Sequence, residues 1–504
     1  MNELTTSSVD KLKLKMSLGE LLAGLCDVSA YAGLEISGVA LHTDFVAPGY
    51  LFVALGNGIN HLQTAQDRGA TAVLCATAPD HPVNLPIIIS PALSSQLGCI
   101  GAKFYGDPSQ QLKVIGITGT NGKTSCSQLI AEGLAHHGMS CGVIGTVGYG
   151  FIHALTPSSL TTPDSLTLQR LMAEIRQANA RAVTIEVSSH ALIQQRVDKV
   201  KFDIGVFTNL SRDHLDYHHD MQAYAAAKRL LFSQPSMKQA VINADDPVGR
   251  AYINELKDKL SIFAYACNDI EIPDIPVIRA KAIKQSAGGL TAQVITPWGA
   301  GELQSRLLGK FNLSNLLAVI TVQCLLGIDL ADVLGRLHQL SGVLGRMQRF
   351  GHADQPTVIV DYAHTPDALE NVLLTLREHC DGRLWCVFGC GGDRDAGKRP
   401  EMATVAQRYA HQIIVTDDNP RTESAERIVT DIMRGFTAQA PVTVIHDRAM
   451  AIQAAITQAA PNDIVLIAGK GHETYQIIGQ EKLAFSDAEH VSRCLSAVSR
   501  AFVE

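Results

Sequence analysis

Val114-Ile115-Gly116-Ile117-Thr118-Gly119-Thr120-Asn121-Gly122-Lys123-Thr124-Ser125 is the stretch that decides the fold. Its apolar, β-branched residues predict a strand, its glycines predict a turn, and a helix is predicted to begin near Lys123. A loop between a strand and a helix presents backbone N–H groups and the positive end of the helix to an anion. Lys123 would reach the terminal phosphates of a nucleotide, and the Thr124 hydroxyl would bind Mg²⁺. The stretch therefore predicts a site for ATP and Mg²⁺.

The stretch differs at one position from the generic phosphate-loop pattern G-x-x-x-x-G-K-[ST], because Ile117 stands where the pattern has glycine. A glycine-rich turn followed by an ordinary surface lysine is the alternative interpretation. The variant at residues 119–124, Gly-Thr-Asn-Gly-Lys-Thr, resembles the phosphate loop of the Mur ligase family. Members of this family are ATP-dependent enzymes that form amide bonds in cell-wall synthesis.

Length and composition predict a multidomain globular protein. A chain of 504 residues is too long for one hydrophobic core, and the usual domain size predicts about three domains. A net charge of -7 argues against binding nucleic acid by neutralising its phosphates, so no nucleic-acid partner is expected. No apolar run is long enough to span a bilayer, and the first residues lack the apolar core of a signal peptide. We expect no membrane insertion and a cytoplasmic location.

Cysteines and histidines give no convincing metal site. The 11 cysteines are scattered, which indicates a reducing compartment rather than a disulfide framework. Cys380, Cys386 and Cys390 match no standard zinc spacing and are interpreted as core thiols. His218 and His219 also follow no zinc spacing rule, and with Tyr217 they are interpreted as a polar loop.

The expected fold class is α/β in three domains. Residues 1–110 are predicted to form a small α/β domain with a positioning or binding role, after a loose leader over residues 1–16, and the resemblance implies that this domain binds a UDP-sugar. Ser17-Leu18-Gly19-Glu20 is a capping-box pattern and predicts a short helix over Leu21, Leu22 and Leu25. Strands are predicted at residues 36–41, 50–55, 71–75 and 87–89.

Residues 111–345 are predicted to form a central ATP-binding domain with a mainly parallel sheet. Its strands are predicted at residues 114–118, 182–187, 202–208 and 239–242, with helices between them. Short alternating runs around Gly288-Gly289 and Gly299 predict an antiparallel addition between residues 277 and 308. Helices are predicted at 312–326 and 330–340, followed by a hinge at 341–345.

Residues 346–504 are predicted to form a Rossmann-like, doubly wound domain that binds an amino acid. Strands are predicted at residues 357–360, 384–388, 412–416 and 464–467, and each is followed by a polar segment. The carboxyl ends of parallel strands meet at one edge of a sheet, where such folds bind ligands. Arg394, Asp418, Arg421 and Glu473 would meet there. Guanidinium groups bind carboxylates and carboxylates bind ammonium groups, so a zwitterionic substrate is expected; surface ion pairs are the alternative.

Two further polar residues are candidates for binding Mg²⁺, one because of its position in the sequence and the other because of the resemblance. Glu186 comes at the end of a predicted buried strand, where its carboxylate suits Mg²⁺; a helix cap by Ser188 or Ser189 is the alternative interpretation. Lys228 would ordinarily be a solvated helix lysine. The resemblance implies instead that Lys228 is carbamylated and helps to bind a second Mg²⁺.

The resemblance covers about residue 40 to the end, and among Mur ligases it points to those that add meso-diaminopimelate to UDP-N-acetylmuramoyl-L-alanyl-D-glutamate. It implies peptidoglycan synthesis, and hence a role in cell shape and division. The residues implied to act in catalysis are Lys123, Glu186, His214 and Lys228, and those implied to bind Mg²⁺ are Thr124, Glu186, His214 and carbamylated Lys228. Those implied to bind ATP are Gly119, Thr120, Asn121, Gly122, Lys123, Thr124, Asn315, Arg346 and Asp361. Those implied to bind the UDP-sugar-peptide are Leu41, Thr43, Asn57, Thr161, Thr162, Ser188, Gln194 and Arg196. Those implied to bind diaminopimelate are Arg394, Asp418, Asn419, Pro420, Arg421, Gly469 and Glu473.

Arg421 carries most of the amino-acid assignment, because lysine-adding members differ at the Asp-Asn-Pro-Arg segment. The first domain departs from the family, since His42-Thr43-Asp44 replaces the usual Asp-Ser-Arg and Gly56-Asn57-Gly58 replaces Gly-His-Gln.

The expected partners are small-molecule substrates, and the expected state is a monomer. A folylpolyglutamate synthase-like ligase and a non-catalytic nucleotide-binding regulatory module are the alternative functions. The family chemistry implies an acyl phosphate and closure of the domains about the hinge.

Overall fold

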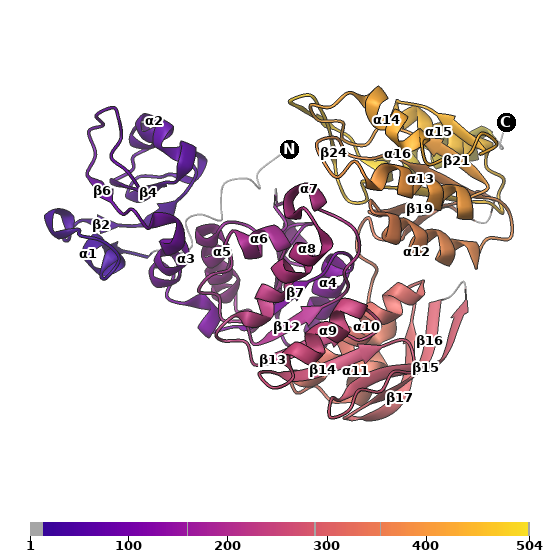
Figure 1. The fold of residues 1–504 in the computed structure, drawn as a ribbon, viewed down its shortest axis with the longest axis horizontal. Helices are drawn as coiled ribbons and strands as arrows, with labels where there is room; N and C mark the ends of the chain where they lie inside the picture. The colour runs from indigo at the N-terminus through magenta and orange to yellow at the C-terminus, as the bar shows by residue number, and fades with distance from the viewer. Residues whose placement is uncertain (1–13, 159, 287–288, 353, 502–504) are drawn as a thin grey trace. The chain divides into compact units, whose positions relative to one another are not determined.

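The computed structural model describes residues 14–158, 160–286, 289–352 and 354–501 (Figure 1). The predicted leader thus lies mostly outside the described residues, as does Gly288. Contacts group the chain into two units. The first contains Met1–Thr118, Gly138–Gly205 and Leu230–Lys238, and the second contains Gly119–His137, Val206–Arg229 and Gln239–Glu504. The domain boundaries at residues 110 and 345 stay a prediction.

The N-terminal part of the first unit is a parallel sheet between helices. Its strand order is β3-β4-β5-β6, and a short pair, β1-β2, lies outside it. Leu51 and Val53 of β4 pack with α1 and α3, whereas Phe52 and Ala54 pack with α2 on the other face. Covering both faces is what an all-parallel sheet requires. The bounds are β1 Met16–Ser17, α1 Leu18–Leu22, β2 Glu35–Ile36, β3 Gly38–Ala40, β4 Tyr50–Ala54, α2 Leu62–Asp67, β5 Ala72–Cys75, β6 Ile87–Ile89 and α3 Leu93–Phe104.

The rest of the first unit carries the strand that leads into the phosphate loop. Strands β8, β11 and β7 are parallel neighbours, and β9 and β10 continue the sheet as an antiparallel hairpin. Strand β11 is buried along its whole length. Its last residue, Glu186, lies beside Ile117 of β7 at the carboxyl end of the sheet. The bounds are β7 Lys113–Thr118, β8 Cys141–Ile144, β9 Tyr149–Phe151, β10 Ala154–Thr156, α5 Ser165–Gln177, β11 Ala182–Glu186 and α6 Ser189–Ile193.

The second unit begins with the phosphate loop and the helix after it, and it contains the predicted antiparallel addition. Strands follow the order β12-β13-β14-β15-β16-β17, in which β13, β14 and β15 are parallel and β15, β16 and β17 antiparallel. Helix α10 is buried on all its sides, as expected for a helix in the middle of a domain. The bounds are α4 Lys123–His136, β12 Ile204–Phe207, α7 Leu215–His218, α8 Met221–Arg229, β13 Gln239–Asn243, α9 Pro247–Leu256, β14 Ser261–Ala266, β15 Val277–Ser286, β16 Gly289–Thr296, β17 Gly299–Ser305, α10 Lys310–Leu325 and α11 Leu330–Arg336.

The C-terminal part of the second unit, orange to yellow in Figure 1, is a doubly wound sheet. Its strand order is β18-β19-β23-β20-β21-β22; β18 is antiparallel to β19, and the other strands are parallel. Cys386 and Leu466 pack against α12, α13 and α14, whereas Val387 and Val465 pack against α15 and α16. This alternation confirms the predicted doubly wound fold. The bounds are β18 Gln348–Phe350, β19 Thr357–Asp361, α12 Pro366–Arg377, β20 Leu384–Phe388, α13 Lys398–Tyr409, β21 Gln412–Val415, α14 Ala425–Met433, β22 Val442–Val444, α15 Arg448–Gln458, β23 Ile464–Ala468, β24 Tyr475–Ile478, β25 Glu481–Ala484 and α16 Asp487–Ala501.

Some local predictions were wrong. The single strand predicted at 36–41 is divided at Ser37, whose N–H donates to the Gly49 carbonyl at 2.8 Å while β2 pairs with β1 and β3 with β4. Helix α1 keeps its predicted capping box but ends at Leu22, before Gly24 with φ 77°. Tyr217 and His218 belong to helix α7 rather than to a polar loop, and the buried His218 ring stacks on the Tyr224 ring with 5.0 Å between their centres. Strands β8 and β14 were not predicted.

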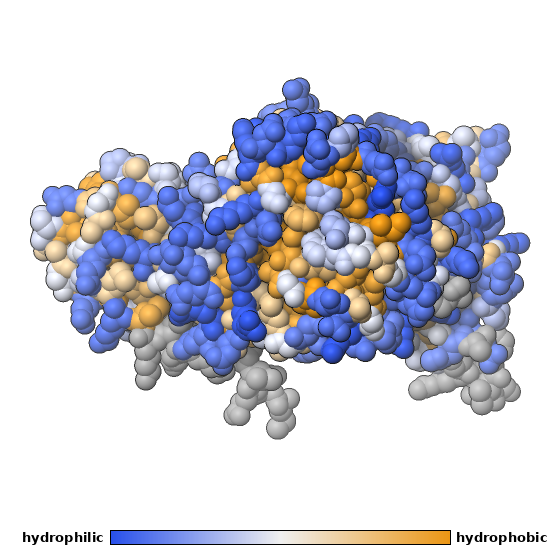
Figure 2. Space-filling model, turned by 90° about the horizontal axis from the view of Figure 1, so that it is seen from below, coloured by the Kyte–Doolittle hydropathy of each residue, from blue (hydrophilic) through white to orange (hydrophobic). Residues whose placement is uncertain are grey.

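One face of the protein is shown in Figure 2, where hydrophobic residues lie toward the middle of the view between hydrophilic borders. Exposed hydrophobic side chains such as Leu344 and Met450 are a normal part of a protein surface. Among residues 14–501, leaving out 159, 287–288 and 353, none of the helices combines the length and the apolar character that crossing a membrane needs.

Arg448→Met is expected to lower the free energy of unfolding by roughly 3–5 kcal/mol, as when one partner of a buried ion pair is removed. Arg448 donates to Asp487 through Nε and Nη2, at 2.8 Å each, and both side chains are 0% exposed. The variant would leave the Asp487 carboxylate buried without its cation. Urea unfolding measures the loss, and Arg448→Met/Asp487→Leu should recover most of it. An unchanged unfolding midpoint in the single variant would contradict the prediction.

Candidate active site

The phosphate loop requires glycine at both of its tight positions. Gly119 has φ 149°, and a Cβ there would lie 1.8 Å from Thr208 Oγ1. Gly122 has φ 84°, and a Cβ there would lie 2.7 Å from Asn315 Oδ1. Thr208 Oγ1 in turn donates to the Asn121 carbonyl at 2.6 Å. The loop is therefore held against the segment after β12 with no room for side chains at its glycines.

Two lysines converge on one carbonyl of this loop. Lys123 Nζ donates to the Gly119 and Thr120 carbonyls at 2.9 and 2.8 Å, and Lys228 Nζ donates to the Gly119 carbonyl at 2.7 Å. The Lys228 side chain is buried, and its Nζ lies 4.3 Å from the centre of the Tyr224 ring. Burial, and then the Lys123 ammonium, lower the pKa of Lys228 well below its usual value. The structure thus places Lys228 at the phosphate loop, which the sequence alone did not predict.

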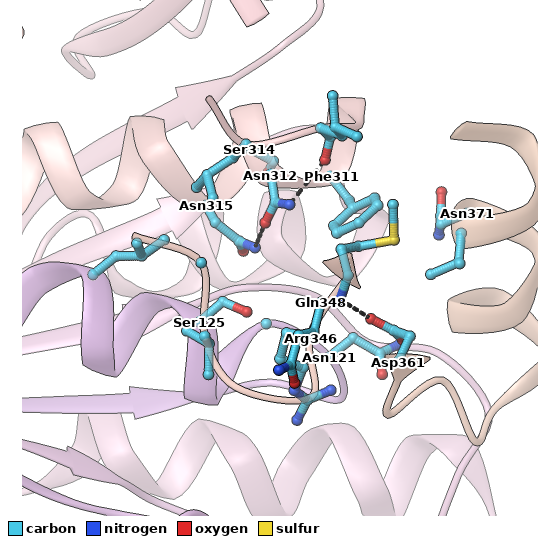
Figure 3. A pocket seen from close by; sticks show the side chains of 18 of the residues that line it. Asn121, Ser125, Phe311, Asn312, Ser314, Asn315, Arg346, Gln348, Asp361 and Asn371 are labelled. Carbon is cyan, nitrogen blue, oxygen red and sulfur yellow. Dashed lines mark hydrogen bonds between the residues drawn. The ribbon is translucent and has the colours of Figure 1, made fainter. Parts of the chain in front are cut away.

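A cavity of about 590 Å³ lies beside the loop, close to α10 (Figure 3). Asn312 and Asn315 face it from one side of α10, and Asn315 Nδ2 donates to Asn312 Oδ1 at 3.3 Å. Phe311 offers an aromatic face and Asn371 lies opposite. This mixture of apolar surface and a few polar groups is typical of small-molecule sites. Its position at the phosphate loop indicates a nucleotide pocket.

Arg346 and Asp361, both expected to bind ATP, line the same cavity. Arg346 Nη2 donates to Thr124 Oγ1 at 3.3 Å, and its guanidinium carbon lies 4.5 Å from the centre of the Tyr362 ring. Asp361 Oδ2 accepts from the Met347 N–H at 2.7 Å. Burial raises the pKa of Asp361, although Arg346 opposes this. These contacts tie residues 346–362 to the phosphate loop.

A second set of contacts near the loop joins residues far apart in sequence. Asn121 Nδ2 donates to Asp367 Oδ2 at 2.9 Å. Asp213, almost fully buried, lies 3.4 Å from Lys398 Nζ and 3.4 Å from His214 Nε2. Burial by itself would raise the pKa of Asp213, but the Lys398 ammonium and then His364 outweigh it and hold the pKa well below its usual value. His214, a predicted metal ligand, therefore has an ionised carboxylate beside it.

Glu186 and most residues expected to bind the sugar-peptide lie together in the first unit. Glu186 accepts from the N–H and hydroxyl of Thr146, at 2.9 and 3.0 Å, and Thr146 Oγ1 accepts from the Thr161 hydroxyl at 3.0 Å. Thr162 Oγ1 donates to the Glu186 carbonyl at 2.7 Å and accepts from the Ser188 hydroxyl at 3.3 Å. Arg196 Nη1 donates to the Thr162 carbonyl at 2.9 Å, and its Nε donates to Gln194 Oε1 at 3.0 Å. The structure thus gathers these hydroxyl, amide and guanidinium groups around Glu186.

Leu41, Thr43 and Asn57 lie in the N-terminal part of the first unit, in or beside segments that follow β3 and β4. The Thr43 carbonyl accepts from Arg68 Nη1 at 2.7 Å, and the same Nη1 lies 3.1 Å from Asp44 Oδ1. Arg68 therefore brings a guanidinium group to the segment from which the usual arginine is missing. Nothing in the sequence around Arg68 pointed to this contact.

The residues expected to bind diaminopimelate meet at the carboxyl edge of the C-terminal sheet. Arg421, with φ 56°, donates through Nη1 to the Gly392 carbonyl at 2.9 Å and lies close to Gly391. Arg394 also borders Gly391. A Cβ at Gly469 would lie 2.7 Å from Asp418 Oδ2, so glycine at 469 leaves room for that carboxylate. The remaining members of the group, Asn419, Pro420 and Glu473, belong to the same turns after β21 and β23.

Several residues of the site were missed from the sequence. Phe311 and Asn312 precede the predicted Asn315, and the spacing of Asn312 and Asn315 by three places them on one face of a helix, which was a usable signal. Asp213, His364, Asp367 and Lys398 offered no such signal, because their partners lie far away in the chain.

A phosphate loop with an adjoining cavity defines a nucleotide-binding α/β protein. The family model for the Mur ligase middle domain matches residues 117–323, and the model for the Mur ligase glutamate ligase domain matches residues 345–471. The chain is 50% identical over 465 residues, 90% of its length and 95% of the relative, to the UDP-N-acetylmuramoyl-L-alanyl-D-glutamate--2,6-diaminopimelate ligase of Coxiella burnetii. It is 48% identical over 491 residues, 96% of its length and 99% of the relative, to the protein of the same description from Pseudomonas aeruginosa.

A solved structure described as a UDP-N-acetylmuramoyl-L-alanyl-D-glutamate--2,6-diaminopimelate ligase is also similar. It is 35% identical in sequence, with a TM-score of 0.67 over 96% of this chain and 100% of that one. The chain belongs to the Mur ligase family, whose members are ATP-dependent enzymes that form amide bonds.

Proposed function

We propose that this protein joins meso-2,6-diaminopimelate to the D-glutamate side-chain carboxylate of UDP-N-acetylmuramoyl-L-alanyl-D-glutamate, with hydrolysis of ATP, in peptidoglycan synthesis. Relatives at 50% and 48% identity that carry this description over almost their whole length support the proposal. The observation that carries it is the convergence of Arg421, Asp418 and Glu473 at one sheet edge, within the unit that contains the nucleotide pocket. A guanidinium group with two carboxylates suits an amino acid bound by its non-reacting, zwitterionic end.

The chemistry begins with activation of the acceptor carboxylate, which is a poor substrate for an amine because its leaving group would be oxide. A carboxylate oxygen attacks the γ-phosphorus of ATP, the bond to the β-phosphate oxygen breaks, and an acyl phosphate and ADP form. The diaminopimelate amine then attacks the acyl carbon, loses a proton, and phosphate leaves as the amide forms. Phosphoryl transfer of this kind depends on positioning and on cations that neutralise charge. Lys123 is proposed to supply such a cation at the phosphate loop.

Mg²⁺ is proposed to be held by Thr124, Glu186, His214 and carbamylated Lys228. The donor chemistry fits this ion in part as it stands, since Mg²⁺ takes oxygen ligands and Thr124 and Glu186 offer them. An unmodified lysine ammonium cannot bind a cation, so the assignment requires the modification. When bound, Mg²⁺ neutralises charge on the phosphates of the nucleotide.

Carbamylation of Lys228 agrees with its surroundings. The reaction needs a neutral amine: its nitrogen bonds to the carbon of CO₂, and a proton is released. Burial and the Lys123 ammonium lower the pKa of Lys228 well below its usual value, which favours the neutral amine. The carbamate that forms carries a negative charge, and the neighbouring Lys123 ammonium would stabilise it.

Arg421→Ala is expected to raise the KM for diaminopimelate by at least about tenfold and to change the KM for ATP by less than about twofold, because the guanidinium group is proposed to bind the amino acid and not the nucleotide. Arg408→Ala is a matched control, since Arg408 lies on α13 with a side chain that is 72% exposed. Initial rates of phosphate release, with one substrate varied at a time, give both constants. Equal effects of the Arg421 variant on the two KM values would contradict the proposed site.

The alternative functions make different predictions. A folylpolyglutamate synthase-like ligase would release phosphate with folate and glutamate but not with diaminopimelate. A regulatory module would bind ATP without ligating any pair of substrates. We propose that the protein acts as a monomer, and we place the reaction in the cytoplasm, where nucleotide substrates are made.

A further inference from the structure

A buried ammonium group lies beneath the residues proposed to bind diaminopimelate. Lys470 follows β23 directly, and its side chain is 0% exposed. A buried charge is strongly unfavourable unless it is paired and hydrogen-bonded. The proposed chemistry has no role for this lysine, so the partners that justify its burial indicate what it does.

Both hydrogen-bond partners of Lys470 belong to the proposed amino-acid site. Its Nζ donates to Glu473 Oε2 at 2.9 Å and to Asn419 Oδ1 at 3.1 Å. Asn419 Oδ1 also accepts from the Ile477 N–H at 3.0 Å, and Asn419 Nδ2 donates to Glu473 Oε2 at 2.9 Å. Only one orientation of the Asn419 amide satisfies these bonds, since its oxygen must face two donors. Lys470 therefore fixes the side chains of Asn419 and Glu473 together.

The two hydrogen bonds to Glu473 end on the same oxygen. Lys470 and Asn419 both donate to Oε2, and among the described residues none donates to Oε1. Glu473 remains partly accessible, with 14% of its side chain exposed. A carboxylate that is held through one oxygen presents the other in a fixed direction, which is how a site recognises an ammonium group.

We propose that Lys470 is a positioning residue for amino-acid recognition, which holds Glu473 so that its Oε1 accepts from the ammonium group at the non-reacting end of diaminopimelate. The inference rests on the proposed function and deepens it, because it names the group that makes the site selective for a second amine. The Lys470 charge also offsets one of the negative charges that Glu473 and Asp418 bring to the site. Lys470 itself does not touch the substrate.

The test compares two amino acids in wild type and Lys470→Met. One is meso-diaminopimelate; the other is 2-aminopimelate, which keeps the attacking amine and both carboxylates but lacks the second amine. Wild type is expected to prefer diaminopimelate in kcat/KM, and Lys470→Met should reduce this preference by at least about tenfold, mainly through KM for diaminopimelate. The KM for ATP should change by less than about twofold.

Asp463→Asn is the matched control for a merely structural effect. Asp463 lies at the opposite end of β23, is 5% exposed, and accepts from the Arg383 N–H at 2.7 Å and from Trp385 Nε1 at 3.1 Å. The control should lower the melting temperature and leave the preference between the two amino acids unchanged. If Lys470→Met behaves in the same way, with a lower melting temperature and an unchanged preference, the inference is wrong.

Two further measurements make the result decisive. Lys470→Gln removes the charge but keeps one donor, so it carries the same test if Lys470→Met does not fold. In a background of Glu473→Gln, loss of Lys470 should add little to the loss of preference, because both changes act on one group; additive losses would overturn the inference. Ligation of diaminopimelate by wild type is measured first: its absence would overturn the proposed function, whereas ligation with an unaltered preference in the variants would overturn only the role of Lys470.

Discussion

Lys228→Ala is expected to lower kcat for ligation by roughly 10²–10³-fold, the range found when one group that stabilises a transition state is removed. The expectation follows from the position of Lys228, which is 1% exposed with its Nζ 2.7 Å from the Gly119 carbonyl oxygen. A carbamate there would lie at the phosphate loop, where negative charge moves during phosphoryl transfer. Coupled assays of ADP release measure kcat, and the KM for ATP should change much less.

Lys228→Arg separates carbamylation from a simple need for a cation. Arginine keeps the positive charge but is not carbamylated, so this variant should be as inactive as Lys228→Ala. Full activity of the arginine variant would contradict the proposal.

The pH dependence of Lys228 carbamylation provides a second check. The pKa of Lys228 is lowered, so the fraction of neutral amine rises with pH through that lowered pKa. Enzyme depleted of bicarbonate should lose activity and regain it when bicarbonate is added; at a fixed concentration of dissolved CO₂ the recovery should be faster at higher pH, up to the lowered pKa. Activity that does not respond to bicarbonate would argue for an unmodified lysine.

Lys123→Ala is expected to lower kcat/KM for ATP by about 10³-fold or more, as when a cation that stabilises a transferring phosphoryl group is lost. In the structure the Lys123 ammonium donates to two carbonyls of its own loop, at 2.9 and 2.8 Å from Gly119 and Thr120. It therefore already lies where the phosphates of a nucleotide would bind. Initial rates at varied ATP concentration measure the loss.

Lys113→Ala is a suitable control for Lys123→Ala, because Lys113 lies at the other end of β7 and its side chain is 57% exposed. It pairs with Asp203 at 2.9 Å, and exposed pairs contribute only about 0–1 kcal/mol. Its replacement should leave kcat/KM for ATP unchanged. A loss of activity in Lys113→Ala equal to that in Lys123→Ala would show a general effect on β7 rather than on phosphate binding.

The features predicted correctly from the sequence are those that depend on neighbours in the chain. The phosphate loop was recognisable because Gly119 and Gly122 are required locally by their positive φ angles. The C-terminal sheet was recognisable because each strand, such as β23, is an apolar run that ends in a polar segment. The antiparallel strands β15, β16 and β17 followed from short alternating runs and turn glycines. The fold class was therefore predictable without coordinates.

Features that depend on distant contacts were not predictable. The burial of Lys228 depends on Gly119, which lies 109 positions earlier in the chain. The contact of Asn121 with Asp367 spans 246 positions. Lys470 lies between two glycines, a pattern that is typical of an exposed turn. Its side chain is nevertheless buried, and its ammonium group donates to Asn419, which follows another strand. Short strands such as β8 were missed, because four residues that include a glycine give too weak a pattern.

The most direct test of the account is to follow oxygen from the acceptor carboxylate. The purified protein is incubated with ATP, diaminopimelate and UDP-N-acetylmuramoyl-L-alanyl-D-glutamate labelled with ¹⁸O in the D-glutamate side-chain carboxylate, and the products are analysed by mass spectrometry. We expect one ¹⁸O in each phosphate released and a product extended by one diaminopimelate through an amide bond. Release of unlabelled phosphate, or absence of the extended product, would contradict it.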